Sequence, residues 1–214
     1  LANIALARGD AQTALNLAQR SRAELRTRTH SVQASVFTLI ARAAIEAGDL
    51  KTARDAVTEA KKIYAERGLP ALSARAVAQV AAELAALTGD RSGAEAEYAQ
   101  LSQRFPVDQA AQSAPLSRLL VDNSRARVAS ALRQWEEVMR LLSPWLTPAE
   151  GTTLPGTMRG EALLLAAEAA VNLRRPDATR LIADASRALE SSDVASSPRL
   201  ARLRSLQAQL RNST

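Results

Sequence analysis

The sequence predicts an all-α protein: a right-handed α-α superhelix (solenoid) of about five helical hairpins plus a C-terminal capping helix. Hydrophobic residues make up 47% of the 214 residues but aromatic residues only 3%, which favours helices that meet through small side chains. No segment alternates apolar and polar residues over the length of a strand. The dipeptide Gly-Asp recurs at residues 9, 48 and 89, with weaker equivalents at 133–134 and 173–177. This spacing of 39 to 44 residues indicates a repeat protein.

The segment 37–60, FTLIARAAIEAGDLKTARDAVTEA, shows how one hairpin is built. Gly48 tolerates the left-handed conformation that ends the first helix, and Asp49 accepts hydrogen bonds from the free amides that begin the second. Apolar or small residues recur at spacings of three and four on both sides of this break. Because that spacing places them on one face of each helix, the two faces can meet.

The same signals predict the other elements in order. Helices are expected at 1–8, 11–26, 31–47, 50–67, 71–88, 91–105, 116–132, 134–143, 157–174, 177–191 and 198–211. Residues 68–70 and Pro106 end two of them, and we expect a loose turn of helix at 107–114. Residues 144–156 contain three prolines and two glycines, so they are expected to form a linker that no continuous helix can span. The leucines of the last helix lie on one face, which is typical of the cap of a repeat stack.

The residues that flank the breaks resemble those of a known family. The second unit has Phe37, Ile40, Ala41 and Ala44 before the turn and Ala53, Val57 and Ala60 after it; the third has Ala78, Ala81, Ala82 and Ala85, then Ala94, Tyr98 and Leu101; the fifth has Leu165, Ala166 and Ala169, then Ala178, Ile182 and Ala185. This pattern resembles the tetratricopeptide repeat (TPR) family. The resemblance implies that residues 1–214 form a single TPR-like repeat domain, expected to be a fragment of a longer bacterial protein. It also implies a non-catalytic protein-binding scaffold, the regulatory or sensory module of a signalling or transcription-regulating protein.

In such a stack the first helix of each hairpin faces the concave side. Counting back from the turns, the polar residues expected to line this groove and bind a partner are Thr38, Arg42, Gln79, Glu83, Asn123 and Arg127. Amides would hold the backbone of an extended protein or peptide segment, and Arg would pair with its acidic groups. In the fifth unit the equivalent face is expected to be apolar, with Leu163, Ala167 and Ala170. The alternative interpretation is that these residues have no binding role, because a helix face that is not packed against its neighbours is simply polar.

Two other functions stay open at this point. One is a sensor for a small ligand, with a pocket closed by the 144–156 loop. The other is self-association through the apolar N-terminal helix. Nucleic-acid binding is disfavoured despite the net charge of +6, because exposed aromatics for base stacking are lacking and acidic residues are interspersed.

Composition argues against catalysis. The sequence has no Cys and a single His, His30, so we expect no disulfide, no metal site, no cofactor and no enzyme. Trp135 and Trp145 are interpreted as packing residues, with a partner anchor as the alternative for Trp145. No window is apolar enough to span a bilayer, so we expect no membrane insertion. The absence of Cys leaves the compartment open: the cytoplasm is favoured, and the periplasm would follow from an upstream membrane span.

Overall fold

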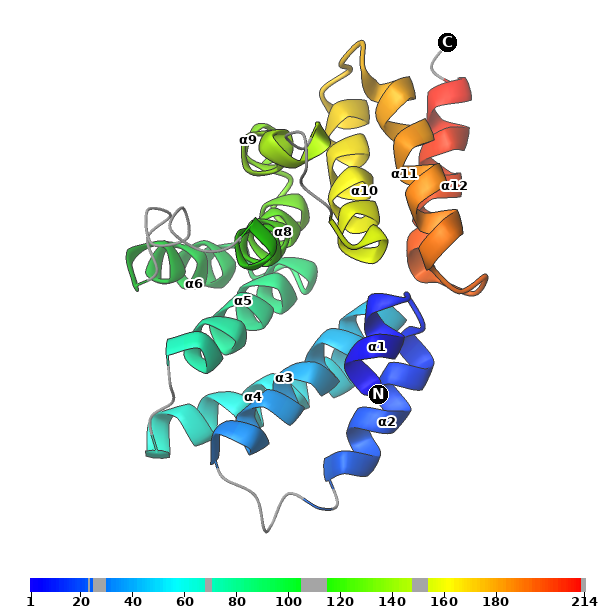
Figure 1. The fold of residues 1–214 in the computed structure, drawn as a ribbon. Coiled ribbons are helices and arrows are strands. Elements are labelled where there is room, and N and C mark those ends of the chain that lie inside the picture. Colours follow the sequence, from blue (N-terminus) through cyan, green and yellow to red (C-terminus); the bar gives the residue numbers. More distant parts are fainter. Residues whose placement is uncertain (23, 25–29, 68–70, 105–114, 148–153, 213–214) are drawn as a thin grey trace. The chain divides into compact units, whose positions relative to one another are not determined.

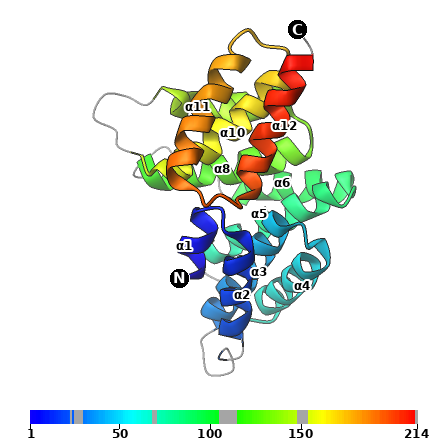
Figure 2. The same cartoon turned by 90° about the vertical axis from the view of Figure 1, so that its right-hand side faces the viewer.

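The computed structural model describes residues 1–22, 24, 30–67, 71–104, 115–147 and 154–212, and this part of the chain is helical without any strand. It divides into two compact units (Figures 1 and 2), which comprise Leu1–Leu6 with Asp10–Pro106, and Ala7–Gly9 with Val107–Thr214. The all-helical prediction is therefore confirmed for the described residues. The predicted turn of helix at 107–114 and residues 148–153 of the predicted linker lie outside them.

The helices follow the predicted order closely. The first unit contains α1 (Ala2–Ala7) except its last residue, α2 (Ala11–Arg22), α3 (His30–Ala47), α4 (Leu50–Arg67), α5 (Ala71–Leu87) and α6 (Arg91–Arg104). The second contains α8 (Pro115–Ala131), α9 (Trp135–Leu146), α10 (Gly156–Asn172), α11 (Ala178–Ser192) and α12 (Pro198–Asn212). Successive helices pair as hairpins, such as α3 with α4 and α10 with α11 (Figure 1). Within each unit the first helices of neighbouring hairpins also touch, α3 with α5 and α8 with α10.

One turn geometry recurs at every predicted break. The residues with positive φ are Gly9, Gly48, Gly89, Arg133 and Arg174, with φ of 68°, 79°, 83°, 60° and 52°. In each case the next residue donates its backbone N–H to the carbonyl five positions earlier, as Asp49 does to Ala44 at 2.8 Å. This is the Schellman pattern, which satisfies carbonyls that the end of the helix leaves free. The sequence signal was clear where glycine occupies the turn and weak where arginine does.

The Gly-Asp breaks also start the following helix as predicted. Asp10, Asp49 and Asp90 accept a backbone hydrogen bond from the residue three positions later, at 3.1, 3.0 and 2.9 Å. These caps satisfy amides that have no partner inside the helix. Gln134 and Asp177, at the two weaker breaks, make no such side-chain cap.

The prediction that helix 134–143 ends before Pro144 is wrong. The helix continues to Leu146 with Pro144 inside it. Proline has no N–H to donate to the Arg140 carbonyl, but the Ser143 hydroxyl donates to that oxygen at 3.3 Å. Trp145 then secures the last turn, because it is only 6% exposed and packs in the core of the unit. The packing interpretation of Trp145 is confirmed, and Trp135 also packs against this core.

Each unit has its own apolar core. In the first unit the core is formed mainly by alanines of α2, α3 and α4, including Ala14, Ala41 and Ala53, with Phe37 and Ile40. In the second unit larger residues dominate, and α10 is the central helix, covered by α8, α9, α11 and α12. The leucines of α12, predicted to be the buried face of a cap, join this core through Leu200, Leu203 and Leu206.

Candidate functional site

Three of the six predicted binding residues occupy the same position in three hairpins. Thr38, Gln79 and Asn123 each lie ten residues before the left-handed residue that ends their helix, on α3, α5 and α8. Their exposed fractions are 8%, 9% and 2%. Because a buried polar group needs a hydrogen-bond partner, the partner of each side chain decides what it can bind.

The donors of Thr38 and Asn123 have partners inside the protein. The Thr38 hydroxyl donates to the Ala34 carbonyl one turn earlier in the same helix, at 2.8 Å. The Asn123 side-chain Nδ2 donates to the backbone carbonyl of Met158, in the first turn of α10, at 3.0 Å. Asn123 therefore uses its amide to join α8 to α10 within the second unit.

Gln79 differs from both. Its Nε2 is buried and has no hydrogen-bond partner. An unpaired buried donor costs about 1–3 kcal/mol of stability. Of the three side chains in this row, Gln79 is therefore the one with an unsatisfied buried donor, on α5 of the first unit, whereas the unsatisfied atom of Asn123 is an acceptor, its Oδ1.

The three charged residues of the prediction also share a position. Arg42, Glu83 and Arg127 each lie six residues before the left-handed residue of their hairpin. Arg127 forms an ion pair with Glu161 of α10, and the two side chains are 10% and 16% exposed. Arg42 and Glu83 are partly buried, and each takes part in an interaction. Arg127 is thus already paired within its own unit.

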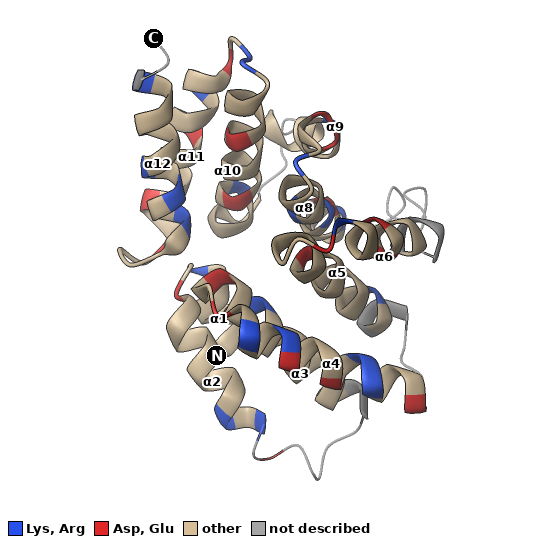
Figure 3. Cartoon of the chain, turned by 180° about the vertical axis from the view of Figure 1, so that it is seen from behind, with Lys and Arg blue, Asp and Glu red and all other residues tan. Residues whose placement is uncertain are grey.

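Two acidic residues of α10 complete a polar network that the sequence analysis missed. Glu161 pairs with Arg127, and Glu168 Oε2 accepts hydrogen bonds from Ser130 of α8 at 3.0 Å and Arg202 of α12 at 2.6 Å. Figure 3 shows acidic residues on α10 and basic residues on α12. This polar network links α8, α10 and α12 along one side of the second unit.

The expectation of an apolar inward face on the fifth unit is wrong. Leu163, Ala167 and Ala170 are at most 1% exposed and belong to the core. The polar stripe of α10 instead carries Glu161 and Glu168, seven residues and hence about two turns apart. Glu161 and Glu168 lie thirteen and six residues before Arg174, the left-handed residue of this hairpin. The sequence did not identify Arg174 as the reference position, because a turn without glycine gives a weak signal.

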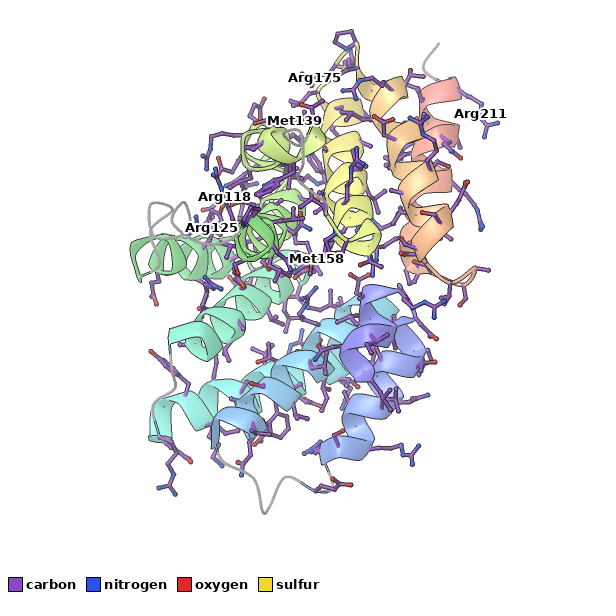
Figure 4. The ribbon with its side chains drawn as sticks, viewed as in Figure 1. Arg118, Arg125, Met139, Met158, Arg175 and Arg211 are labelled. Carbon is purple, nitrogen blue, oxygen red and sulfur yellow. The ribbon has the colours of Figure 1, made fainter. Side chains whose placement is uncertain are left out.

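A second buried polar group lies between α8 and α9. Asp122 accepts a hydrogen bond from the indole Nε1 of Trp145 at 2.9 Å, and Arg118 lies 3.6 Å from its Oδ2. The Arg118 guanidinium also lies 5.8 Å from the centre of the Trp145 ring. Figure 4 shows Arg118 and Arg125 projecting from α8. Burial raises the pKa of the Asp122 carboxyl, although the indole and the nearby arginines act in the opposite direction. This group secures the end of α9 and leaves Trp145 unavailable as a partner anchor.

The alternative of a ligand pocket closed by the 144–156 loop stays a prediction, because residues 148–153 lie outside the described part of the chain. Residues 144–146 are helical, and the clefts at α2–α4 and α11–α12 are lined by residues outside 144–156. In the described ranges, no three His, Cys, Asp or Glu side chains are placed to hold a metal ion. None of the described helices combines the length and the apolar character needed to cross a membrane.

Comparisons with known proteins give no family assignment. No protein-family model, curated protein or solved structure matches the chain. The functional argument therefore depends on the geometry of the chain itself.

Proposed function

We propose that this chain is a non-catalytic, TPR-like protein-binding module, and that its first unit holds an extended peptide segment against α3 and α5. The recurrence of one Schellman turn at spacings of 39 to 44 residues supports a stack of similar hairpins. Contacts between the first helices of neighbouring hairpins within each unit support the same architecture. The regulatory or sensory role of such a module is part of this proposal.

The unpaired amide of Gln79 is the observation that carries the proposal. In the second unit the equivalent side chain, Asn123, donates its amide to a main-chain carbonyl of a neighbouring segment. In the first unit the corresponding donor has no acceptor. A bound extended segment has main-chain carbonyls at regular intervals, so it can supply the acceptor that the free chain lacks. Rotation of the flexible terminal torsions of Gln79 brings its amide to such a carbonyl.

The other predicted residues take unequal parts in this binding. Arg42 and Glu83, at a common position of α3 and α5, provide opposite charges for side chains of the segment, with Arg42 favouring acidic ones. Thr38 contributes to the shape of the binding surface and donates no hydrogen bond to the segment, because its hydroxyl already donates to a carbonyl of its own helix. Asn123 and Arg127 are assigned to the internal packing of the second unit.

The test is a selection of random linear peptides displayed on phage against the whole chain, followed by affinity measurements by fluorescence polarisation. Gln79→Met keeps the length of the side chain but removes its donor, and Gln100→Met, at an exposed site on α6, is the matched control. Loss of one neutral hydrogen bond of about 0.5–1.5 kcal/mol predicts two- to tenfold weaker binding to Gln79→Met and no change in the control. Enriched peptides that bind Gln79→Met as tightly as the wild type, or the absence of any enriched peptide, would refute the proposal.

A further inference from the structure

The first unit contains a cleft that the predicted groove residues do not line. It has a volume of about 420 Å³ and lies between α2 and α4, with α3 at its base. Phe37 and Ile40 form the base, and they are 8% and 3% exposed. Polar side chains form the walls, so the cleft combines an aromatic floor with charged sides.

The charges of this cleft are of both signs but are not joined to one another. Asp55 and Glu59 line the α4 wall, and Arg22 lines the α2 wall. Asp55 pairs with the exposed Lys51 at 3.2 Å, outside the cleft. Within the described part of the chain, the partly buried Glu59 makes no ion pair or hydrogen bond. The cleft therefore presents a carboxylate that is not neutralised by a neighbour.

A guanidinium group already occupies the aromatic floor. The Arg22 guanidinium carbon lies 5.3 Å from the centre of the Phe37 ring, within the range of a cation–π contact. Arg22 is an exposed residue at the last position of α2, so its side chain is displaced at little cost. Its position shows that a guanidinium group fits over the Phe37 ring.

We propose that the α2–α4 cleft is a binding site for an arginine side chain of a partner protein segment. The incoming guanidinium replaces that of Arg22 on the Phe37 ring and pairs with Glu59, while Gln19 and Asp55 supply further acceptors at the rim. A planar fork of N–H donors suits this combination of ring and carboxylate better than an ammonium group does. This site is independent of the proposed groove, because it uses none of the groove residues.

The proposal is tested with the blocked peptide Gly-Ser-Arg-Ser-Gly and its citrulline analogue, titrated into the isotope-labelled chain and followed by amide chemical shifts. Citrulline has the shape of arginine but no charge. The arginine peptide is expected to shift amides of α2 and α4, and the citrulline peptide is expected to leave them unchanged. Equal effects of the two peptides, or no effect of the arginine peptide on either the wild type or Arg22→Ala, would overturn the proposal.

Two substitutions should change the affinity in opposite directions. Arg22→Ala removes the internal competitor and should tighten binding of the arginine peptide about two- to fivefold, the equivalent of one exposed cation–π contact. Glu59→Gln should weaken binding by a similar factor. Glu66→Gln makes the same charge change at an exposed site on α4 outside the cleft and should have no effect. Weaker binding by Arg22→Ala would show that Arg22 supports the ligand instead of occupying its place, and would refute the arginine assignment.

Discussion

Substitutions at one repeat position should change the stability of the two units in opposite directions. Gln79→Met removes a buried Nε2 that has no hydrogen-bond partner and replaces it with an apolar group of similar size. Since leaving such a donor unpaired costs about 1–3 kcal/mol, we expect the free energy of unfolding of the first unit to rise by about 1 kcal/mol. The same variant is expected to bind peptide less tightly, so Gln79 would lower stability in favour of function.

Asn123→Asp should have the opposite effect on the second unit. The substitution preserves shape but replaces the donor that binds the Met158 carbonyl at 3.0 Å with a carboxylate oxygen. Two acceptors would then face each other at a site that is 2% exposed. We expect a loss of at least about 2 kcal/mol at neutral pH, because a buried charge would lack its hydrogen bond.

Urea denaturation with two probes separates these effects. Both tryptophans, Trp135 and Trp145, lie in α9, so their fluorescence reports the second unit, whereas far-UV circular dichroism reports helices of both. Gln79→Met should shift the dichroism transition to higher urea, and Asn123→Asp should shift the fluorescence transition to lower urea. A lower stability of Gln79→Met would show that its Nε2 has a partner in solution, and this result would refute the reasoning behind the proposed peptide site.

Two further predictions concern the turns and the buried carboxylate. Gly48→Ala should lower the free energy of unfolding by about 1 kcal/mol, because φ is 79° although no atom lies within 4 Å of the added Cβ. Arg174→Gly, where φ is 52°, should raise the free energy of unfolding by about 0.5 kcal/mol. If urea denaturation showed both variants to be less stable or both to be more stable than the wild type, the explanation by positive φ would be contradicted. The pKa of Asp122 in the folded chain is raised above its ordinary value of 3.8, so the unfolded chain loses this proton at lower pH than the folded chain does. The free energy of unfolding therefore falls as the pH rises from 3.8 through the pKa of the folded chain. Asp122→Asn keeps an acceptor for Trp145 and should remove this decline; a decline of unchanged size across that window would exclude Asp122 as its source.

Local rules predicted the helices well because the signals that end and start them are local. A glycine in the left-handed region followed by an aspartate cap needs only a few consecutive residues, as at Gly48 and Asp49. The rule failed at Pro144, where two contacts compensate for the missing backbone donor. One of them, between Trp145 and Asp122, joins residues that are 23 positions apart. No local pattern reports such a contact.

The candidate site was predicted less completely, for a related reason. Helical periodicity identifies which residues share a face, and it predicted the row of Thr38, Gln79 and Asn123. Periodicity does not show what lies opposite that face. The partners of Asn123 and Arg127 are residues of α10 that lie 35 and 34 positions later in the chain. Sequence reasoning therefore placed the polar side chains but could not distinguish those that bind a neighbouring helix from those left to bind another molecule.

This distinction also decides how the groove can be tested. Reversing the charge of Arg127, which the sequence alone suggests as a test of partner binding, would place a glutamate beside Glu161 in a region that is 10% to 16% exposed. Like charges at such a site destabilise the packing of α8 on α10, so a loss of binding would report damage to the second unit. Gln79→Met avoids this problem because the side chain it replaces makes no hydrogen bond through Nε2. The unpaired donor of Gln79 is therefore a better test of binding than the charge of Arg127, since that charge already holds α8 on α10.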